Sequence, residues 1–145
     1  EVIIVSSLPE ADADSNGLPD YWERLHFGLT GSAATADTDG DGISNRDEYI
    51  AGTSPVDGND IPRIEISPKA DGTLVLEFIA TAALQSSYTG GSRYYAIEAA
   101  TTLGPEATWL PLADSGKIFG NNLPVLKITS INGPRRFFRL RVWLE

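Results

Sequence analysis

Residues 37–48 read DTDGDGISNRDE, and five of these twelve side chains are acidic. A similar stretch, DADSNGLPDYWE, occupies residues 12–23. A shift of 25 residues places the acidic, amide and glycine positions of the first stretch on those of the second. Carboxylates so close together repel one another unless a cation lies among them. The repeated stretch therefore predicts a pair of cation sites.

Both stretches fit the pattern D-x-[DN]-x-[DN]-G-x5-E of an EF-hand calcium loop. Calcium takes six to eight oxygens, supplied by side chains at loop positions 1, 3 and 5, a carbonyl at position 7, often a water held by position 9, and a bidentate Glu at position 12. Glycine at position 6 permits the sharp turn. In the first loop the predicted ligands are Asp12, Asp14, Asn16, Leu18, Asp20 and Glu23. In the second loop they are Asp37, Asp39, Asp41, Ile43, Asn45 and Glu48. Two Ca²⁺ ions are expected, and two solvated acidic turns are the plainer alternative that the in-phase repetition disfavours.

The segments beside the loops depart from a standard EF-hand. Helices are predicted after the loops, over residues 21–27 and 46–51, with Gly28 and Gly52 as C-terminal stops. Pro19 suits the first turn of the first helix, and Ser44 with Asp47 resembles a capping pair for the second. The stretches before the loops do not resemble amphipathic helices, so we expect two loop–helix units without entering helices. The residues expected to pack these units together are Leu18, Trp22, Leu25, Ile43, Tyr49 and Ile50.

Loop position 8 bears on how the loops pair. Paired EF-hand loops join through short β hydrogen bonds at this position, but here it holds Pro19 and Ser44, and proline has no N–H to donate. Calmodulin-like pairing, with an opening switch that grasps a target, is therefore not expected.

Charge and composition narrow the function classes. The net charge is −9, and residues 1–60 carry 13 acidic and 2 basic side chains, against 7 acidic and 9 basic in residues 61–145. Such an acidic first part disfavours nucleic acid as a partner. The chain has no cysteine and one histidine, His26, so thiol chemistry and multi-histidine sites are excluded. No apolar run is long enough to span a membrane. The chain begins without Met and without a signal peptide, so we expect a piece of a longer or processed protein.

The pattern changes near residue 60. After the turn-rich stretch 52–62, alternating apolar runs predict strands at residues 63–67, 73–80, 93–99, 108–112, 124–130 and 135–143. Residues 70–72, ADG, predict a hairpin turn. Short strands between Gly, Pro and Asn turns favour an antiparallel β-sandwich of the immunoglobulin or fibronectin III type. The predicted domains are thus a calcium-binding loop–helix module, residues 1–60, and a β-sandwich, residues 61–145. The expected core residues of the sandwich are Trp109, Phe138, Leu140 and Val142.

Residues 12–55 resemble the thrombospondin type-3-like calcium repeats of large secreted or surface bacterial proteins, and dockerins are a related arrangement. Residues 93–142, with YYAIEAATTLG and RRFFRLRV, resemble the β-domain that follows such repeats. The resemblance implies an extracellular setting in which millimolar calcium fills the loops. It also implies that neighbouring repeats can share ligands, in which case Asp57, Asn59 and Asp60 would add oxygens; a polar linker turn is the plainer interpretation.

Four function classes follow. The leading one is a calcium-stabilised, non-catalytic module with a structural or adhesive role in a larger parent chain. The second is a dockerin-like module that binds a protein receptor, although dockerins usually close the loop with Asp. The third is a carbohydrate-binding sandwich for a surface glycan, which needs exposed aromatics among Tyr88, Tyr94, Tyr95 and Trp143. An enzyme is the least expected, since Glu65, Glu77 and Glu98 are better explained as partners of arginines.

Overall fold

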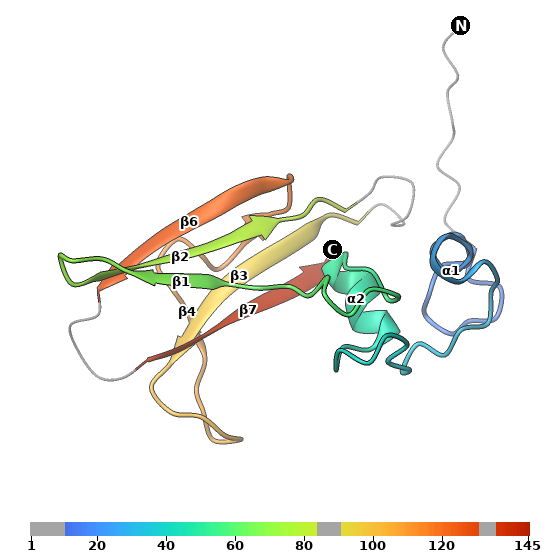
Figure 1. Ribbon diagram of the computed structural model, residues 1–145, viewed down its shortest axis with the longest axis horizontal. Coiled ribbons are helices and arrows are strands. Elements are labelled where there is room, and N and C mark those ends of the chain that lie inside the picture. The colour runs from blue at the N-terminus through green and yellow to red at the C-terminus, as the bar shows by residue number, and fades with distance from the viewer. Residues whose placement is uncertain (1–10, 84–90, 131–135) are drawn as a thin grey trace, which may run out of the picture. The chain divides into compact units, whose positions relative to one another are not determined.

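The computed structural model describes residues 11–83, 91–130 and 136–145, and the chain forms two compact units (Figure 1). One unit consists mainly of the residues up to Ile61, and the other of Pro62–Ala82 and Arg93–Leu144. The sequence-based assignment of two domains meeting at residues 60 and 61 stays a prediction.

Two short helices follow the two acidic loops, as predicted. Helix α1 spans Asp20–Phe27 and helix α2 spans Asn45–Ala51. Each ends at a glycine in the left-handed region, Gly28 at φ 77° and Gly52 at φ 79°, a conformation that glycine adopts without strain. The hydroxyl of Ser44 accepts the Asp47 N–H, which confirms the capping pair of α2. Pro19 is the N-cap of α1, one residue before the helical turn expected to contain it.

The helices contact each other through Trp22, which is 3% exposed and meets the Tyr49 ring edge-on at 5.7 Å between centroids. Leu18 is fully buried in the same unit. The prediction for Leu25 was wrong, because this side chain is 55% exposed. Helix α1 turns Glu23, at loop position 12, toward the interior of the unit. Leu25 lies two residues later, about 200° further around the helix, and therefore faces solvent.

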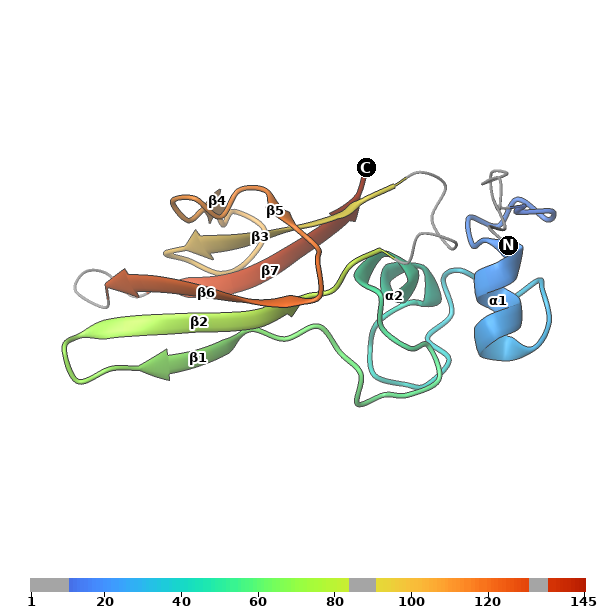
Figure 2. The ribbon, with the colours of Figure 1, turned by 90° about the horizontal axis from the view of Figure 1, so that it is seen from above.

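The described residues of the second unit form seven strands in two antiparallel sheets. The strands are β1 Glu65–Pro68, β2 Thr73–Ala80, β3 Arg93–Ala100, β4 Leu110–Pro111, β5 Ile118–Phe119, β6 Leu123–Ser130 and β7 Phe137–Leu144. One sheet has the order β1-β2-β6, and in the other β3 pairs with β4, β5 and β7. The view in Figure 2 separates the layer of β1 and β2 from the layer of β3 and β4. This arrangement fits the predicted β-sandwich.

The core of the sandwich lies between the two sheets. Buried residues of β2 and β3 form it, namely Leu76, Phe78, Ala80, Tyr95 and Ile97. Phe138, Leu140 and Val142 of β7 pack against this cluster, while Arg139 and Arg141 alternate with them on the other face. The alternation expected for β7 is confirmed, because successive side chains of a strand point to opposite faces.

Three details of the sandwich differ from expectation. Strand β5 had no sequence signal, since it pairs with β3 over only two residues. Strand β4 is likewise reduced to two residues. Trp109, predicted to lie in the core, lies beside the outer face, where the guanidinium of Arg139 covers its ring at 4.4 Å from the centroid. The hairpin turn at residues 70–72 is confirmed, because the Lys69 N–H donates to the Thr73 carbonyl and the Lys69 carbonyl accepts the Gly72 N–H.

Candidate metal centre

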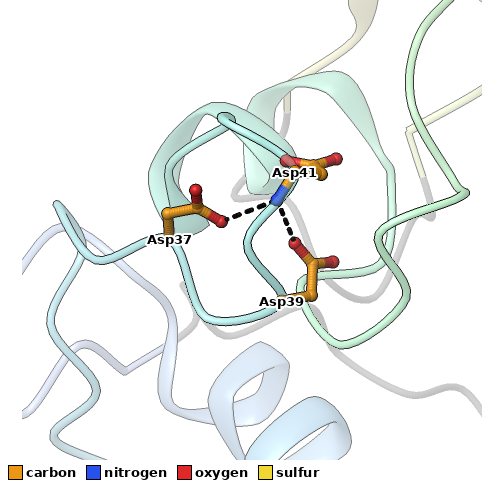
Figure 3. A group of neighbouring side chains, drawn as sticks. All are labelled: Asp37, Asp39 and Asp41. Atoms are coloured by element: carbon orange, nitrogen blue, oxygen red, sulfur yellow. Dashed lines mark hydrogen bonds between the residues drawn. The ribbon is translucent and has the colours of Figure 1, made fainter.

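The second acidic loop is wound around the carboxylate of Asp37. Oδ1 of Asp37 accepts the N–H groups of Gly40 and Asp41 at 2.8 and 3.2 Å, and Oδ2 of Asp37 accepts the N–H of Gly42 at 2.9 Å. Asp39 Oδ1 accepts the same Asp41 N–H at 3.3 Å (Figure 3). The short acidic side chains thus accept the backbone N–H groups of the turn. The curved backbone also brings the carboxylate oxygens that accept no hydrogen bond close together.

Asp37, Asp39 and Asp41 come close enough to hold one ion. One ligand oxygen from each lies within 4.8 Å of the others. Figure 3 shows the three carboxylates around the same turn. Hard divalent cations such as Ca²⁺ prefer carboxylate oxygens in such clusters.

Glu48, the first-turn glutamate of α2, supplies the strongest evidence for a cation. The residue is 0% exposed, and neither carboxylate oxygen has a hydrogen-bond partner among the described residues. Burial, together with the charges of Asp39, Asp41, Asp37 and Asp60, raises the pKa of Glu48 to about 7. Asp39 Oδ2 and Asp41 Oδ2 are also buried and have no hydrogen-bond partner in the part of the chain that the structure describes. A buried carboxylate that lacks any donor is costly, and a cation would satisfy all these oxygens.

The first loop has the same internal hydrogen bonds. Asp12 accepts the N–H groups of Asn16 and Gly17 at 3.1 and 2.9 Å, as Asp37 does in the second loop. Asn16 Oδ1 accepts the Leu18 N–H at 2.7 Å, and Asp41 Oδ1 accepts the Ile43 N–H at the same distance. The sequence repeat is therefore a structural repeat. The ligand roles predicted for the Leu18 and Ile43 carbonyls stay predictions.

The two loops differ in how far protein donors already satisfy their oxygens. The Asn16 amide nitrogen donates to Asp14 Oδ2 at 3.0 Å and to Glu23 Oε1 at 3.2 Å. Glu23 Oε1 also accepts two backbone N–H groups, leaving only Oε2 buried without a partner. In the second loop Asp41 stands where Asn16 stands, and it can donate nothing. Among the described residues, residues 37–48 therefore hold more buried carboxylate oxygens that lack a hydrogen-bond donor and could bind a cation.

Position 9 behaves alike in both loops and is engaged within the protein. Asp20 Oδ1 accepts the N–H of Ala13 at 2.9 Å, and Oδ2 accepts from the Arg24 guanidinium at 3.0 Å. Asn45 Oδ1 accepts from the Thr38 hydroxyl at 2.8 Å, and its amide donates to the carbonyl of Ala33 at 2.9 Å. In each loop position 9 thus bonds to position 2. These side chains fasten the ends of the loop together, and the ligand role through water that the sequence pattern predicts for them stays a prediction.

The segment after α2 returns to the second loop. A side-chain carbon at Gly58 would lie 3.4 Å from the Asp39 carbonyl and 3.5 Å from Asp41 Cβ. Asp57 Oδ1 accepts the N–H and the side-chain amide of Asn59, which is the geometry of a polar turn. Asp60 Oδ2 accepts the Ser54 N–H at 3.0 Å, and its charge acts on Glu48. Gly58 thus lies close against the second loop. The sequence predicted neither this close approach nor the burial of the Thr53 hydroxyl, which has no hydrogen-bond partner among the described residues.

The other candidate sites lie on the sandwich. Glu98 is 4% exposed and bonds Arg139 at 2.7 Å, with Arg141 at 3.5 Å, so its interpretation as an ion-pair partner holds. Glu65 and Glu77 face each other across β1 and β2 in exposed positions. Tyr95 is in the core, and Tyr88 lies outside the described residues.

Comparison with known proteins agrees with the geometry of the second loop. Residues 37–58 match the sequence model of the bacterial TSP3 repeat. The match covers the loop, α2 and the returning segment as far as Gly58. It supports a thrombospondin type-3-like calcium-binding repeat at this place. No curated protein and no solved structure matches the chain significantly.

Proposed function

We propose that the chain is a calcium-binding, calcium-stabilised, non-catalytic module. The observation that carries the proposal is the fully buried Glu48 carboxylate, both of whose oxygens lack a hydrogen-bond partner in the described part of the chain. Oxygens of Asp37, Asp39 and Asp41 lie within 4.8 Å of one another, and the charges of these residues act on Glu48. The TSP3 repeat matched at residues 37–58 supports calcium as the ion.

A bound ion would stabilise the loop–helix unit in two ways. Its charge would remove the repulsion among the carboxylates, and it would satisfy oxygens that the fold buries. Because the oxygens converge only in the folded loop, the free energy of calcium binding adds to the free energy of unfolding. Glu48 and Glu23 also connect each ion to a helix, so the ion would fix the helix relative to its loop.

The setting we propose is a larger secreted or surface protein, in which the module has a structural or adhesive role. The proposal rests on the TSP3 match, because such repeats occur in extracellular proteins. Neither helix in the described part of the chain is long and apolar enough to cross a membrane. A dockerin-like role, with a protein receptor bound through the helices, stays an alternative for calcium-dependent pull-down experiments.

The deciding experiment removes calcium with a chelator and then titrates it back by calorimetry, with a thermal melt at each end. We expect two bound ions and a large rise in melting temperature. Binding of one ion would restrict the proposal to residues 37–48. An absence of binding, with unchanged folding, would show that the loops are acidic turns only.

A specific observation also favours a second candidate, carbohydrate binding by the sandwich. On the face of β3 and β7 opposite the core, Tyr94 stacks on Trp143 at 5.9 Å between centroids, and Phe119 beside them is 54% exposed. Lys117 lies over the Tyr94 ring at 4.2 Å and Arg141 over the Trp143 ring at 5.0 Å from the centroid, so a sugar that stacks on these half-buried rings would displace the two side chains. A glycan array with the full chain tests this, with Trp143→Ala as the comparison. Signals lost in Trp143→Ala would support the idea, and silence with the unsubstituted chain would reject it.

A further inference from the structure

Position 9 of the first loop is bonded within the protein. Asp20, at this position, is 6% exposed, and its two carboxylate oxygens accept hydrogen bonds from Ala13 and from Arg24. A side chain at position 9 ordinarily reaches calcium only through a water, so the shell of an ion at this loop has room for a direct oxygen ligand from another segment.

The chain that leaves α1 returns to this loop at residues 31–32. The N–H groups of Gly31 and Ser32 donate to Glu23 Oε1 at 2.9 and 2.7 Å. Gly31 has φ +92°, and a side-chain carbon there would lie 3.7 Å from Asp14 Oδ2. A glycine at this position thus allows the backbone to approach the acidic side chains closely.

The return brings the Ser32 carbonyl to the same point as two predicted ligands. Around the Asn16 amide nitrogen lie Asp14 Oδ2 at 3.0 Å, Ser32 O at 3.1 Å and Glu23 Oε1 at 3.2 Å. Three oxygens from three separate segments surround one electropositive group, the arrangement that a cation also takes. Glu23 is 0% exposed, and its Oε2 has no hydrogen-bond partner within the described ranges.

We infer that the backbone carbonyl of Ser32 is a ligand of the calcium ion at the first loop. It occupies a place in the shell that position 9 ordinarily fills only through a water, while the Asn16 amide turns its oxygen to the ion and gives up the hydrogen bond from the Leu18 N–H. With Asp12, Asp14, the Asn16 oxygen, the Leu18 carbonyl and Glu23 Oε2, the carbonyl completes a shell of about six oxygens, within the range for calcium. The inference rests on the proposed function, and it makes the first site a structure of residues 12–32 that extends beyond the twelve-residue loop.

The direct test follows the carbonyl itself. In the full chain labelled with ¹³C and ¹⁵N, we expect the ¹³C resonance of the Ser32 carbonyl to shift as calcium fills the first site, together with the side-chain resonances of Glu23. The carbonyl of Gly104, which accepts the Ala107 N–H in the sandwich, is the reference, because it bonds no predicted calcium ligand. If calorimetry shows two bound ions and Ser32 shifts no more than Gly104, the inference is overturned and the proposed function stands. If no calcium binds, both are overturned.

Two substitutions add an independent test. Gly31→Val disfavours the positive φ and displaces the returning segment, so we expect the first site to lose about tenfold or more in affinity, the effect of about 1.4 kcal/mol. Ser32→Ala keeps the carbonyl and the N–H, so it should bind both ions as the unsubstituted chain does. Retained binding at residues 37–48 shows that the Gly31→Val protein is folded. Unchanged affinity at the first site in that variant contradicts the inference.

Discussion

Burial of Glu48 is unfavourable when the loop is empty and favourable when the loop holds an ion. The fold buries its carboxylate completely among other acidic groups and gives it no donor within the described residues. Such a site is unfavourable for an empty loop and favourable for a loaded one. A substitution at this residue therefore has opposite effects in the two states.

We predict that Glu48→Gln stabilises the calcium-free protein and weakens calcium binding at the second loop. The amide carries no charge, so repulsion from the neighbouring aspartates falls, but it offers one oxygen where the carboxylate offers two. Loss of a charged ligand contact of about 1.5–3 kcal/mol corresponds to a loss of about 10- to 100-fold in affinity. Calorimetry and thermal melts with and without calcium measure both effects.

The matched control for this prediction is Glu65→Gln, a substitution at an exposed position of β1. It removes the same charge far from any loop residue in sequence and should leave calcium affinity unchanged. If Glu48→Gln binds two ions with unchanged affinity, Glu48 is not a ligand and the second site has been assigned wrongly.

The pH dependence of the calcium-free protein follows from the same residue. The pKa of Glu48 is raised from its ordinary 4.5 to about 7, so the folded state favours the protonated form. Its contribution to stability is fully present below pH 4.5 and is lost as the pH rises through about 7. In chelator we expect the melting temperature to fall more between pH 5 and pH 8 for the unsubstituted chain than for Glu48→Gln. Equal falls in the two proteins would contradict the assigned shift.

Sequence reasoning found the acidic loops because their residue types and spacing are dictated by the ion. It could not find Ser32, because a backbone carbonyl has no residue signature, or the engaged state of Asp20 and Asn45, which depends on partners at position 2. The sequence shows that loop position 5 is Asn16 in the first loop and Asp41 in the second. Its consequence, an amide nitrogen that bonds Asp14 and Glu23, required the fold.

Among the elements, α2 depends most on its cap, because a helix of seven residues has few internal hydrogen bonds. We predict that Ser44→Ala lowers the stability of the loop–helix unit by about 1 kcal/mol. Ser44→Thr keeps an oxygen that can accept the Asp47 N–H and should retain most of the stability. Chemical denaturation of the calcium-free proteins measures the difference. Equal losses for Ala and Thr would mean that the hydroxyl contributes no cap.

Strands β3 and β7 are joined on their outer face by the ion pair of Glu98 and Arg139. We predict that Arg139→Ala destabilises the sandwich by about 1–3 kcal/mol, because it leaves the buried Glu98 with the longer contact to Arg141 and uncovers Trp109. Arg141→Ala should cost less, since its nitrogen lies 3.5 Å from Glu98. Urea denaturation compares the two variants. A larger loss for Arg141→Ala would contradict this ranking.

The long strands were predicted well from the sequence, and the short strands were predicted poorly. Strands β2, β6 and β7 each contain eight residues whose alternation reflects one buried face. Strands β4 and β5 contain two residues each, too few for a periodic pattern, and they exist because β3 offers them a partner. Trp109 was assigned to the core for its size, but its ring packs under a guanidinium, an interaction that hydrophobicity alone does not predict.

For the whole molecule, the two units differ in what holds them together. The sandwich has an apolar core between its sheets. Among the described residues of the loop–helix unit, the large buried apolar side chains are chiefly Leu18 and Trp22, beside the buried polar groups Asp20, Glu23, Asn45 and Glu48. Calcium should therefore matter to one unit and not to the other. The chain contains three tryptophans, of which only Trp22 belongs to the loop–helix unit.

We predict that chelation of calcium unfolds or loosens the loop–helix unit while the sandwich stays folded. In the variant Trp109→Phe/Trp143→Phe, Trp22 is the sole tryptophan, and its emission should shift to longer wavelength when the chelator exposes the ring that is now 3% exposed. The far-ultraviolet β signal of the same sample should persist, because the sandwich core contains no predicted calcium ligand. Adding calcium back should restore the emission, and magnesium should restore less of it, since Mg²⁺ demands a smaller octahedral shell. An emission spectrum that is unchanged by chelator would show that the apolar contacts of Trp22 suffice to hold this unit, and that calcium has no structural role in it.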